Sequence, residues 1–100
     1  MKLGILVTTD KHLEHVLGIA RAALAKRHEV SVFLMDAGTR LVADPALTGL
    51  AQLPGVKVGL CDHSAKVHGI TMDGLPTQIV CGSQFQNAMM NHNADRVILL

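Results

Sequence analysis

Aromatic side chains are almost missing from this chain of 100 residues, which has no tryptophan, no tyrosine and two phenylalanines. Because apolar residues nevertheless make up 49% of it, the core has to be aliphatic. One hundred residues suffice for one domain that buries about 60–65% of its unfolded surface. So apolar a composition on so small a domain leaves apolar surface exposed, which favours self-association.

An excess of charge of either sign is also missing. Nine basic residues stand against eight acidic ones, and no basic run is longer than Lys26-Arg27. Proteins that bind nucleic acid gather Lys and Arg into patches, usually with aromatic platforms. We therefore expect no nucleic acid among the partners.

No hydrophobic run is long enough to cross a membrane. The opening segment MKLGILVTTD has an apolar run that ends at Val7 and is followed by polar residues. This run is too short for a signal peptide or a membrane span, so we interpret it as a buried strand. Two cysteines and no export signal predict a protein of the reducing cytoplasm with no membrane partner.

Buried strands and amphipathic helices alternate along the rest of the chain. The pattern predicts strands at 3–8, 30–35, 56–60, 79–81 and 97–100, with helices between them at about 11–28, 45–53, 64–68 and from 82 onward. This order predicts a single α/β domain over residues 1–100, a three-layer sandwich with a mostly parallel sheet of about five strands and helices on both faces.

Capping signals mark several predicted helix ends. Thr9 or Asp10 is a candidate cap for the first helix, and Asp44 precedes a proline at the first position of the second. Ser64 is the candidate cap of the third helix, and Gly69 its terminator.

Polar and reactive side chains follow the predicted strands where each strand ends. Asp10, Asp36 and Cys61 follow the first three strands, and Cys81 ends the fourth. In parallel sheets, ligands and chemistry gather at this carboxyl edge. We therefore expect a site there, centred on Cys61.

Cys61 lies in the segment GLCDHSAKVHGI, between a strand and a helix. A thiol is a nucleophile only as the thiolate, and its pKa falls from about 8.5 to about 3.5–7.5 at a helix N-terminus or beside positive charge. His63, Lys66 and His68 add positive charge nearby, whereas Asp62 opposes it. These residues alone leave a reactive thiol and an inert, half-buried cysteine both open.

A metal site is the third interpretation of this segment. It would use Cys61, His63 and His68, with Cys81 or His92 as further ligands. Zinc sites have paired ligands at short, repeated spacings, and this spacing is different, so we expect no metal. Elsewhere we interpret His12 and His15 as solvated and His92 as a structural histidine on the face of Phe85.

Cys81 is a candidate second thiol, although a packed cysteine at a strand end is the more ordinary interpretation. A disulfide with Cys61 requires α-carbons within ~7 Å of each other. Familiar catalytic motifs are missing, since the chain has no GxGxxG, GxxxxGK[ST], GxSxG or CxxC segment.

The segment from Cys61 to Ile70, a strand-end cysteine followed by a short helix and Gly-Ile, resembles the motif of the DsrE/DsrF-like family. This family includes the TusD-type sulfur-relay proteins. The stretch from Gly82 to Leu100 is similar to the family's closing helix and Asp-Arg strand. The resemblance implies a compact α/β sandwich that assembles into homo-oligomers or hetero-oligomers, such as dimers, trimers or hexamers.

The resemblance also implies a function for Cys61, which matches the cysteine that carries sulfur as a persulfide from a donor protein to an acceptor protein. Such exchange needs no organic cofactor. We expect His63, Ser64, Lys66 and His68 to support the thiolate from the following helix. Asp36 and Asp10 would lie at the same edge of the sheet.

Three features depart from the family's pattern. The connection between the second strand and Cys61 is short, Asp62-His63 stand where relay members often have small residues, and Cys81 has no counterpart. The alternative to a sulfur carrier is a non-catalytic assembly subunit, or a small-molecule-binding subunit, with an inert Cys61.

Overall fold

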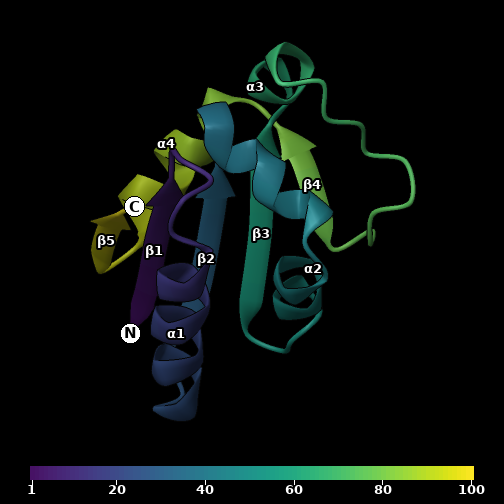
Figure 1. Cartoon of the computed structure of the whole chain (residues 1–100). Helices are drawn as coiled ribbons and strands as arrows, with labels where there is room; N and C mark the ends of the chain where they lie inside the picture. Colours follow the sequence, from purple (N-terminus) through teal and green to yellow (C-terminus); the bar gives the residue numbers. More distant parts are fainter.

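A computed structural model describes residues 1–100, in which five strands form one all-parallel sheet (Figure 1). The strands are β1 (Lys2–Val7), β2 (Glu29–Leu34), β3 (Val56–Cys61), β4 (Ile79–Gly82) and β5 (Arg96–Leu99). Their order across the sheet is β4-β3-β2-β1-β5. The predicted α/β sheet of about five strands is confirmed.

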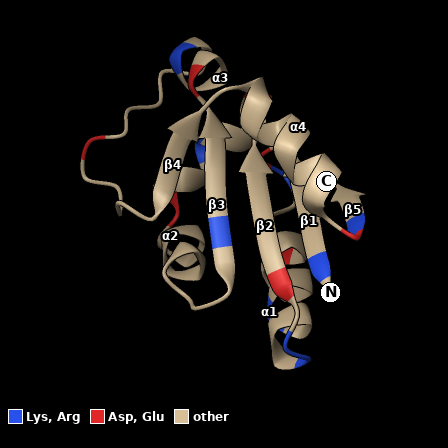
Figure 2. Ribbon diagram, turned by 180° about the vertical axis from the view of Figure 1, so that it is seen from behind, with Lys and Arg blue, Asp and Glu red and all other residues tan.

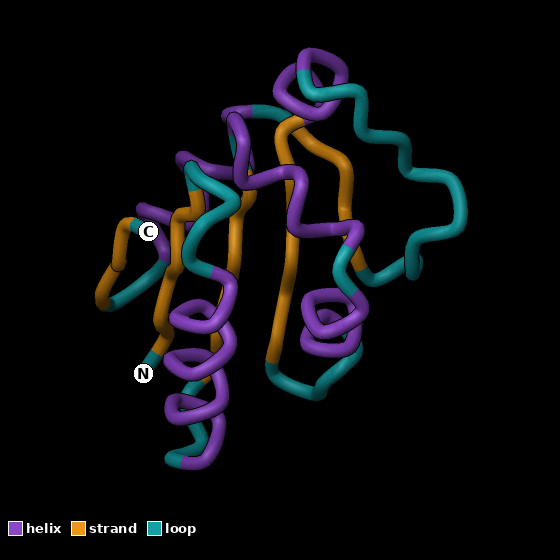
Figure 3. Tube along the Cα trace, in the orientation of Figure 1, coloured by secondary structure: helices purple, strands orange, loops and turns teal.

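Helices lie on both faces of this sheet, as predicted. Helices α1 (Leu13–Ala25) and α2 (Pro45–Ala51) lie in front of it in Figure 1, and α4 (Gln84–Asn93) lies behind it. The short helix α3 (Asp62–Val67) stands at the carboxyl ends of the strands. From there an extended loop runs out from the domain before β4 begins (Figure 3). None of the helices is both long enough and apolar enough to cross a membrane.

The aliphatic core lies between the sheet and the layer formed by α1 and α2. Fully buried side chains alternate along the strands, as Ile5 and Val7 do in β1, and pack against Val16 and Ala20 of α1. Each large aliphatic side chain buried here contributes about 1.5–3 kcal/mol. Val16 and Ala20 are one helical turn apart, so they lie on the face of α1 that packs on the sheet.

The other face of the sheet carries α4 alone. Gly4 of β1 permits its close approach, because a Cβ at this position would lie 3.3 Å from the Cβ of Ala94 and 3.4 Å from the Cγ of Met90. Yet no residue of α4 is buried. Helix α4 contacts β1 and β2, so β3 and β4 are uncovered on this face (Figure 2).

The first helix begins later than predicted. Its N-cap is His12, whose side chain makes no capping hydrogen bond, so the prediction of Thr9 or Asp10 is wrong. Thr9 accepts a hydrogen bond from the amide of Lys11 in a turn of its own, with N and Oγ1 3.4 Å apart. Thr9 and Asp10 therefore lie ahead of the helix and not at its N-cap.

The other caps are partly as predicted. Asp44 caps α2 by accepting a hydrogen bond from the amide of Ala46, at 2.9 Å. Gly69 adopts the left-handed conformation, with φ 68°, just beyond α3. Ser64 is not a cap, because β3 passes into α3 without a connecting residue and Cys61 itself is the N-cap.

Two further details differ from expectation. A 3-10 helix, η1 (Asp36–Ala43), fills the connection after β2, where the sequence analysis predicts no helix. His92 is exposed rather than packed, because α4 turns this side away from the sheet.

Candidate functional site

Cys61 ends β3 and caps α3 at the carboxyl edge of the sheet. It is only 4% exposed. In the pairing of β3 with β4, Cys61 lies opposite Gly82. Because side chains alternate along a strand, Cys61 points to the same face of the sheet as Gly59, which is the face that carries α4.

Two opposing effects act on the pKa of the Cys61 thiol. Burial, the largest single effect, raises the pKa because it disfavours the thiolate. The backbone and hydroxyl of Ser64, the side-chain amide of Gln84 and the backbone of His63 act in the opposite direction by donating toward the sulfur. Together they outweigh burial, so the pKa lies below its ordinary value.

These donors act as dipoles around the sulfur rather than as one strong bond. The Cys61 side chain makes no capping hydrogen bond of full geometry with the first turn of α3. Several weaker N–H and O–H dipoles nevertheless converge on one atom, which favours its charged form. The pKa is lowered by these dipoles and not by the charges of Lys66 and His68 that the sequence brought to attention.

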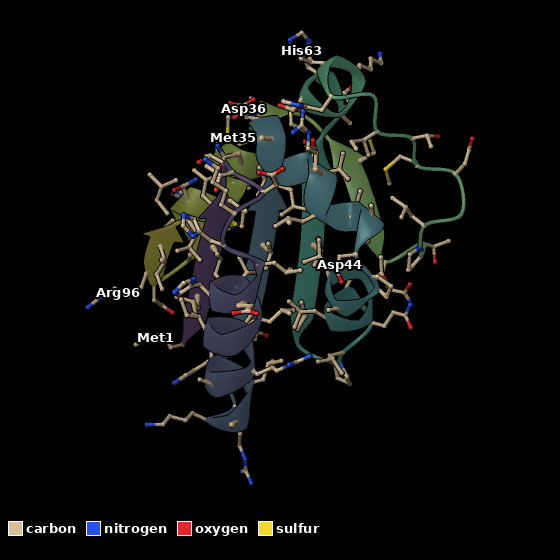
Figure 4. All side chains as sticks on the ribbon, in the orientation of Figure 1. Met1, Met35, Asp36, Asp44, His63 and Arg96 are labelled. Carbon is tan, nitrogen blue, oxygen red and sulfur yellow. The ribbon has the colours of Figure 1, made fainter.

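Gln84 is the residue of this site that sequence analysis missed. It is the first residue of α4, and its Nε2 lies 3.9 Å from the Sδ of Met35, which directly follows β2. Figure 4 shows Met35 beside Asp36 at this end of the sheet. The one signal for Gln84 was its place next to Ser83, which caps α4 together with Gln86 in a capping box.

His68 and Asp36 are brought together, although they are far apart in sequence. The Nε2 of His68, beyond the end of α3, lies 2.9 Å from the Oδ1 of Asp36 in η1. The backbone of Asp36 is left-handed, with φ 50°. This contact connects the end of α3 to η1, which follows β2. The first turn of α3 supplies donors to the Cys61 sulfur.

The side chains of the other predicted site residues, Asp10, His63 and Lys66, do not act on the Cys61 sulfur. Asp10 faces Arg40, with Oδ2 and Nη1 3.5 Å apart. His63 and Lys66 are exposed on α3, and His63 points away from the sheet in Figure 4. Only the backbone of His63 contributes at the sulfur.

Cys81 is exposed, and both cysteines are free thiols. Cys81 pairs with Leu60, a residue of the aliphatic core, and therefore faces the side of the sheet opposite to Cys61. The two thiols are thus separated by the sheet itself. No group of three or more His, Cys, Asp or Glu side chains is arranged to hold a metal ion.

Comparisons with known proteins agree on the fold. The model of the DsrE/DsrF-like family matches residues 1–100. Among solved structures, the chain is similar to the YchN protein from E. coli, with a TM-score of 0.72 and 19% identity over 100% of both chains.

It is also similar to MTH1491 from Methanobacterium thermoautotrophicum, a protein described as of unknown function. The TM-score is 0.78 and the identity 13%, over 99% of this chain and 98% of the other. Comparison with curated protein sequences gives no match.

Proposed function

The chain belongs to the DsrE/DsrF-like family, and from this premise we propose that it is a sulfur carrier that holds persulfide sulfur on Cys61. The observation that carries the proposal is the lowered pKa of the Cys61 thiol at the carboxyl edge of the sheet. A larger thiolate fraction at neutral pH makes Cys61 a better nucleophile than an ordinary cysteine.

Loading is a sulfur exchange that needs no oxidant. The Cys61 thiolate attacks the outer sulfur of a donor persulfide, R–S–SH, and a bond forms between the Cys61 sulfur and that outer sulfur. The donor's S–S bond breaks and its electron pair leaves with the donor as R–S⁻, while the proton stays on the transferred sulfur. An acceptor thiolate then attacks the outer sulfur of Cys61–S–SH in the same way and releases the Cys61 thiolate.

Ser64 and Gln84 have two effects in this reaction. They stabilise the thiolate before attack, and again when the acceptor removes the sulfur. Because Cys61 is buried, a donor reaches it only after side chains around the sulfur have moved. Gln84 is the exposed one of the two, so we infer that the donor and acceptor proteins dock where α4 begins.

The location and the assembly are part of the same proposal. Two free thiols suit a reducing cytoplasm. A chain with 49% apolar residues and only two aromatic ones favours assembly into oligomers.

Intact-mass measurement after incubation with a small persulfide donor tests the proposal. We expect the wild type and Cys81→Ser each to gain one sulfur atom, and Cys61→Ser to gain none. Because Cys81 is exposed, Cys81→Ser is the matched control that removes the more accessible thiol. If Cys61→Ser gains as much sulfur as the wild type, the proposal is wrong.

The burial of Cys61 favours a second candidate, a non-catalytic subunit in which this cysteine is only a packed side chain. The two candidates differ in the pKa of the thiol. A sulfur carrier requires a Cys61 pKa below that of a free thiol, and a packed, inert cysteine requires one at or above it.

A further inference from the structure

Strand β5 forms an edge of the sheet that no other element covers. It pairs with β1 on one side only. In Figure 1 and Figure 2 it lies at the outer margin of the sheet, with no strand or helix beyond it. A strand in this position presents backbone N–H and C=O groups that have no partner. The free side of residues 96–99, the β5 edge, is therefore a place where another strand can pair.

The hydrogen bonds to β1 show which backbone groups of the β5 edge are free. Leu100 donates to the carbonyl of Leu6 and accepts from the amide of Thr8, each at 2.8 Å. The N–H and the C=O of Leu100 thus both point toward β1. Because this direction alternates along a strand, the N–H and C=O groups of Val97 and Leu99 point outward. These two residues give the β5 edge two free donors and two free acceptors.

The side chains of β5 are aliphatic and poorly covered. Val97 is 40% exposed and Leu99 is 66% exposed. Both lie on the side of the sheet that carries α4, because the Cγ2 of Val97 is 3.4 Å from where a Cβ of Gly4 would be. Ile98 lies on the opposite side and is half-buried. The β5 edge thus offers apolar side chains on both faces of the sheet.

The β5 edge lacks the features that keep such an edge unpaired. Native proteins protect edge strands with lysine, proline, inward-pointing charges or bulges. Residues 97–100 contain no charged residue and no proline. Arg96, the first residue of β5, donates from Nη1 to the carbonyl of Asp95 at 2.8 Å and so lies at the start of the strand. Because copies of one chain are always available to each other, an edge without this protection pairs first with itself.

We propose that a second copy of this chain adds its own β5 antiparallel to the β5 edge, about a two-fold axis beside Ile98. Val97 and Leu99 lie on either side of Ile98, so this axis places Val97 opposite the partner's Leu99. Each such pair exchanges two hydrogen bonds. The two pairs together satisfy every outward N–H and C=O group of Val97 and Leu99 in both copies. No other register of two β5 strands satisfies them all.

The proposed pair also packs apolar side chains on both faces of the sheet. Val97 contacts the partner's Leu99 on the side of α4, and Ile98 contacts the partner's Ile98 on the other side. Strands lie about 4.8 Å apart, so the two α4 helices, each over β1 and β2, lie about 19 Å apart. This distance exceeds the helix diameter of about 10–12 Å. The two sheets can therefore continue into each other without a clash between helices.

This inference specifies a surface for the assembly that is part of the proposed function, and it does not depend on sulfur transfer. Cys61 ends β3, and both β2 and β1 lie between β3 and β5. The pair therefore leaves the surroundings of Cys61 unchanged. Sulfur loading and chain pairing are measured separately, so either proposal can fail while the other holds.

Disulfide trapping tests the register. In a Cys61→Ser, Cys81→Ser background, one cysteine at a time is introduced into β5 and oxidised in dilute solution with oxidised glutathione. A disulfide requires α-carbons within ~7 Å of each other. We expect Ile98→Cys to give a linked pair of chains, because the two Ile98 positions face each other at the axis.

The matched control is Val97→Cys, at a position that is more exposed than Ile98 but does not face its own copy. We expect Val97→Cys to stay unlinked when alone and to form linked pairs when it is mixed with Leu99→Cys. If Val97→Cys alone links as fast as Ile98→Cys, or if Ile98→Cys stays unlinked, the proposed register is wrong.

A proline tests the hydrogen bonds. Proline has no N–H and is tolerated in an edge strand where that group faces outward, so Val97→Pro removes a free donor and keeps the ladder with β1. We expect it to halve the mass of the assembly, measured by light scattering after gel filtration. Val97→Thr keeps the N–H and a branched side chain, so it should retain the mass of the wild type.

Circular dichroism checks that both Val97 variants are folded. A Val97→Pro variant that is folded and assembles like Val97→Thr overturns the proposal. So does a wild type that is a single chain, which would leave the β5 edge to an extended segment of another protein.

Discussion

The Nε2–H of His68 donates a hydrogen bond to Oδ1 of Asp36, with Nε2 and Oδ1 2.9 Å apart, and thereby joins the end of α3 to η1. The His68 side chain is 15% exposed, whereas that of Asp36 is 71% exposed. The carbonyl of Asp36 also accepts a hydrogen bond from the buried hydroxyl of Thr39, at 2.8 Å. Asp36 thus connects the end of α3 to the first turn of η1, at the edge of the sheet where Cys61 lies.

The backbone of Asp36 predicts different effects for two substitutions. Its φ of 50° is tolerated by Asp, Asn and Gly but costs other residues about 1–2 kcal/mol. We expect Asp36→Ala to lower the free energy of unfolding by about 1–2 kcal/mol, and Asp36→Asn by less than about 1 kcal/mol, the value of an exposed ion pair.

Urea denaturation measures both variants, with Asp73→Ala in the exposed loop before β4 as the control. Equal losses for Asp36→Ala and Asp36→Asn would show that the side-chain contact, and not the backbone, determines the stability at this position.

The donors around the Cys61 sulfur predict a second set of results. In a Cys81→Ser background, which leaves one thiol, ultraviolet absorbance of the thiolate gives the pKa of Cys61 directly. We expect Ser64→Ala to raise this pKa toward the ordinary value, because it removes the hydroxyl that donates to the sulfur. Gln84→Ala should raise it as well.

Gln78→Ala is the control for Gln84→Ala, because Gln78 is an exposed glutamine of the loop before β4. We expect it to leave the pKa of Cys61 unchanged. A pKa that stays the same in both Ser64→Ala and Gln84→Ala would contradict the role of these donors.

The lowered pKa of Cys61 also predicts how stability depends on pH. The folded chain releases the thiol proton at a lower pH than the unfolded chain, so the unfolded state binds more protons between the two pKa values. In this window stability rises with pH. The contribution is complete above the unfolded pKa of about 8.5 and is lost as the pH falls through the folded pKa.

Urea denaturation at several pH values tests this sign. We expect Cys81→Ser to gain stability relative to the double variant Cys61→Ser, Cys81→Ser as the pH rises to about 8.5. A difference that shrinks over this range would mean that burial, and not the surrounding donors, controls the thiol.

Much of the fold follows from local sequence patterns. Continuous apolar runs, such as the one that ends at Val7, predict strands because both faces of a parallel sheet are covered. The repeat of Val16 and Ala20 predicts the packed side of α1. Cys61 could be placed at the edge of the sheet because it follows such a run directly.

The surroundings of Cys61 were not predictable in the same way. Gln84 reaches the sulfur only because β4 lies beside β3, so that the start of α4 stands next to the end of β3. Strand order is a property of the whole chain and leaves no mark near Gln84. The charges of Lys66 and His68 are visible in the sequence, whereas the backbone dipoles that lower the pKa become apparent only in three dimensions.

Gly38 gives the last prediction, because η1 lies against the end of β1 at this residue. A Cβ here would press on the carbonyl of Val7, 2.9 Å from its carbon, and this carbonyl already accepts a hydrogen bond from Met35. Gly18 is the opposite case, an exposed glycine inside α1 with nothing near its missing Cβ.

We therefore expect Gly38→Ala to lower the free energy of unfolding by about 1–3 kcal/mol, because neither backbone segment has room to move. Gly18→Ala should raise it by about 1 kcal/mol, since alanine favours the helix and meets no neighbour. Thermal unfolding of the two variants measures both signs. If Gly38→Ala were as stable as the wild type, the close contact between η1 and β1 at Gly38 would be contradicted. So would the idea that this contact holds Asp36 opposite His68.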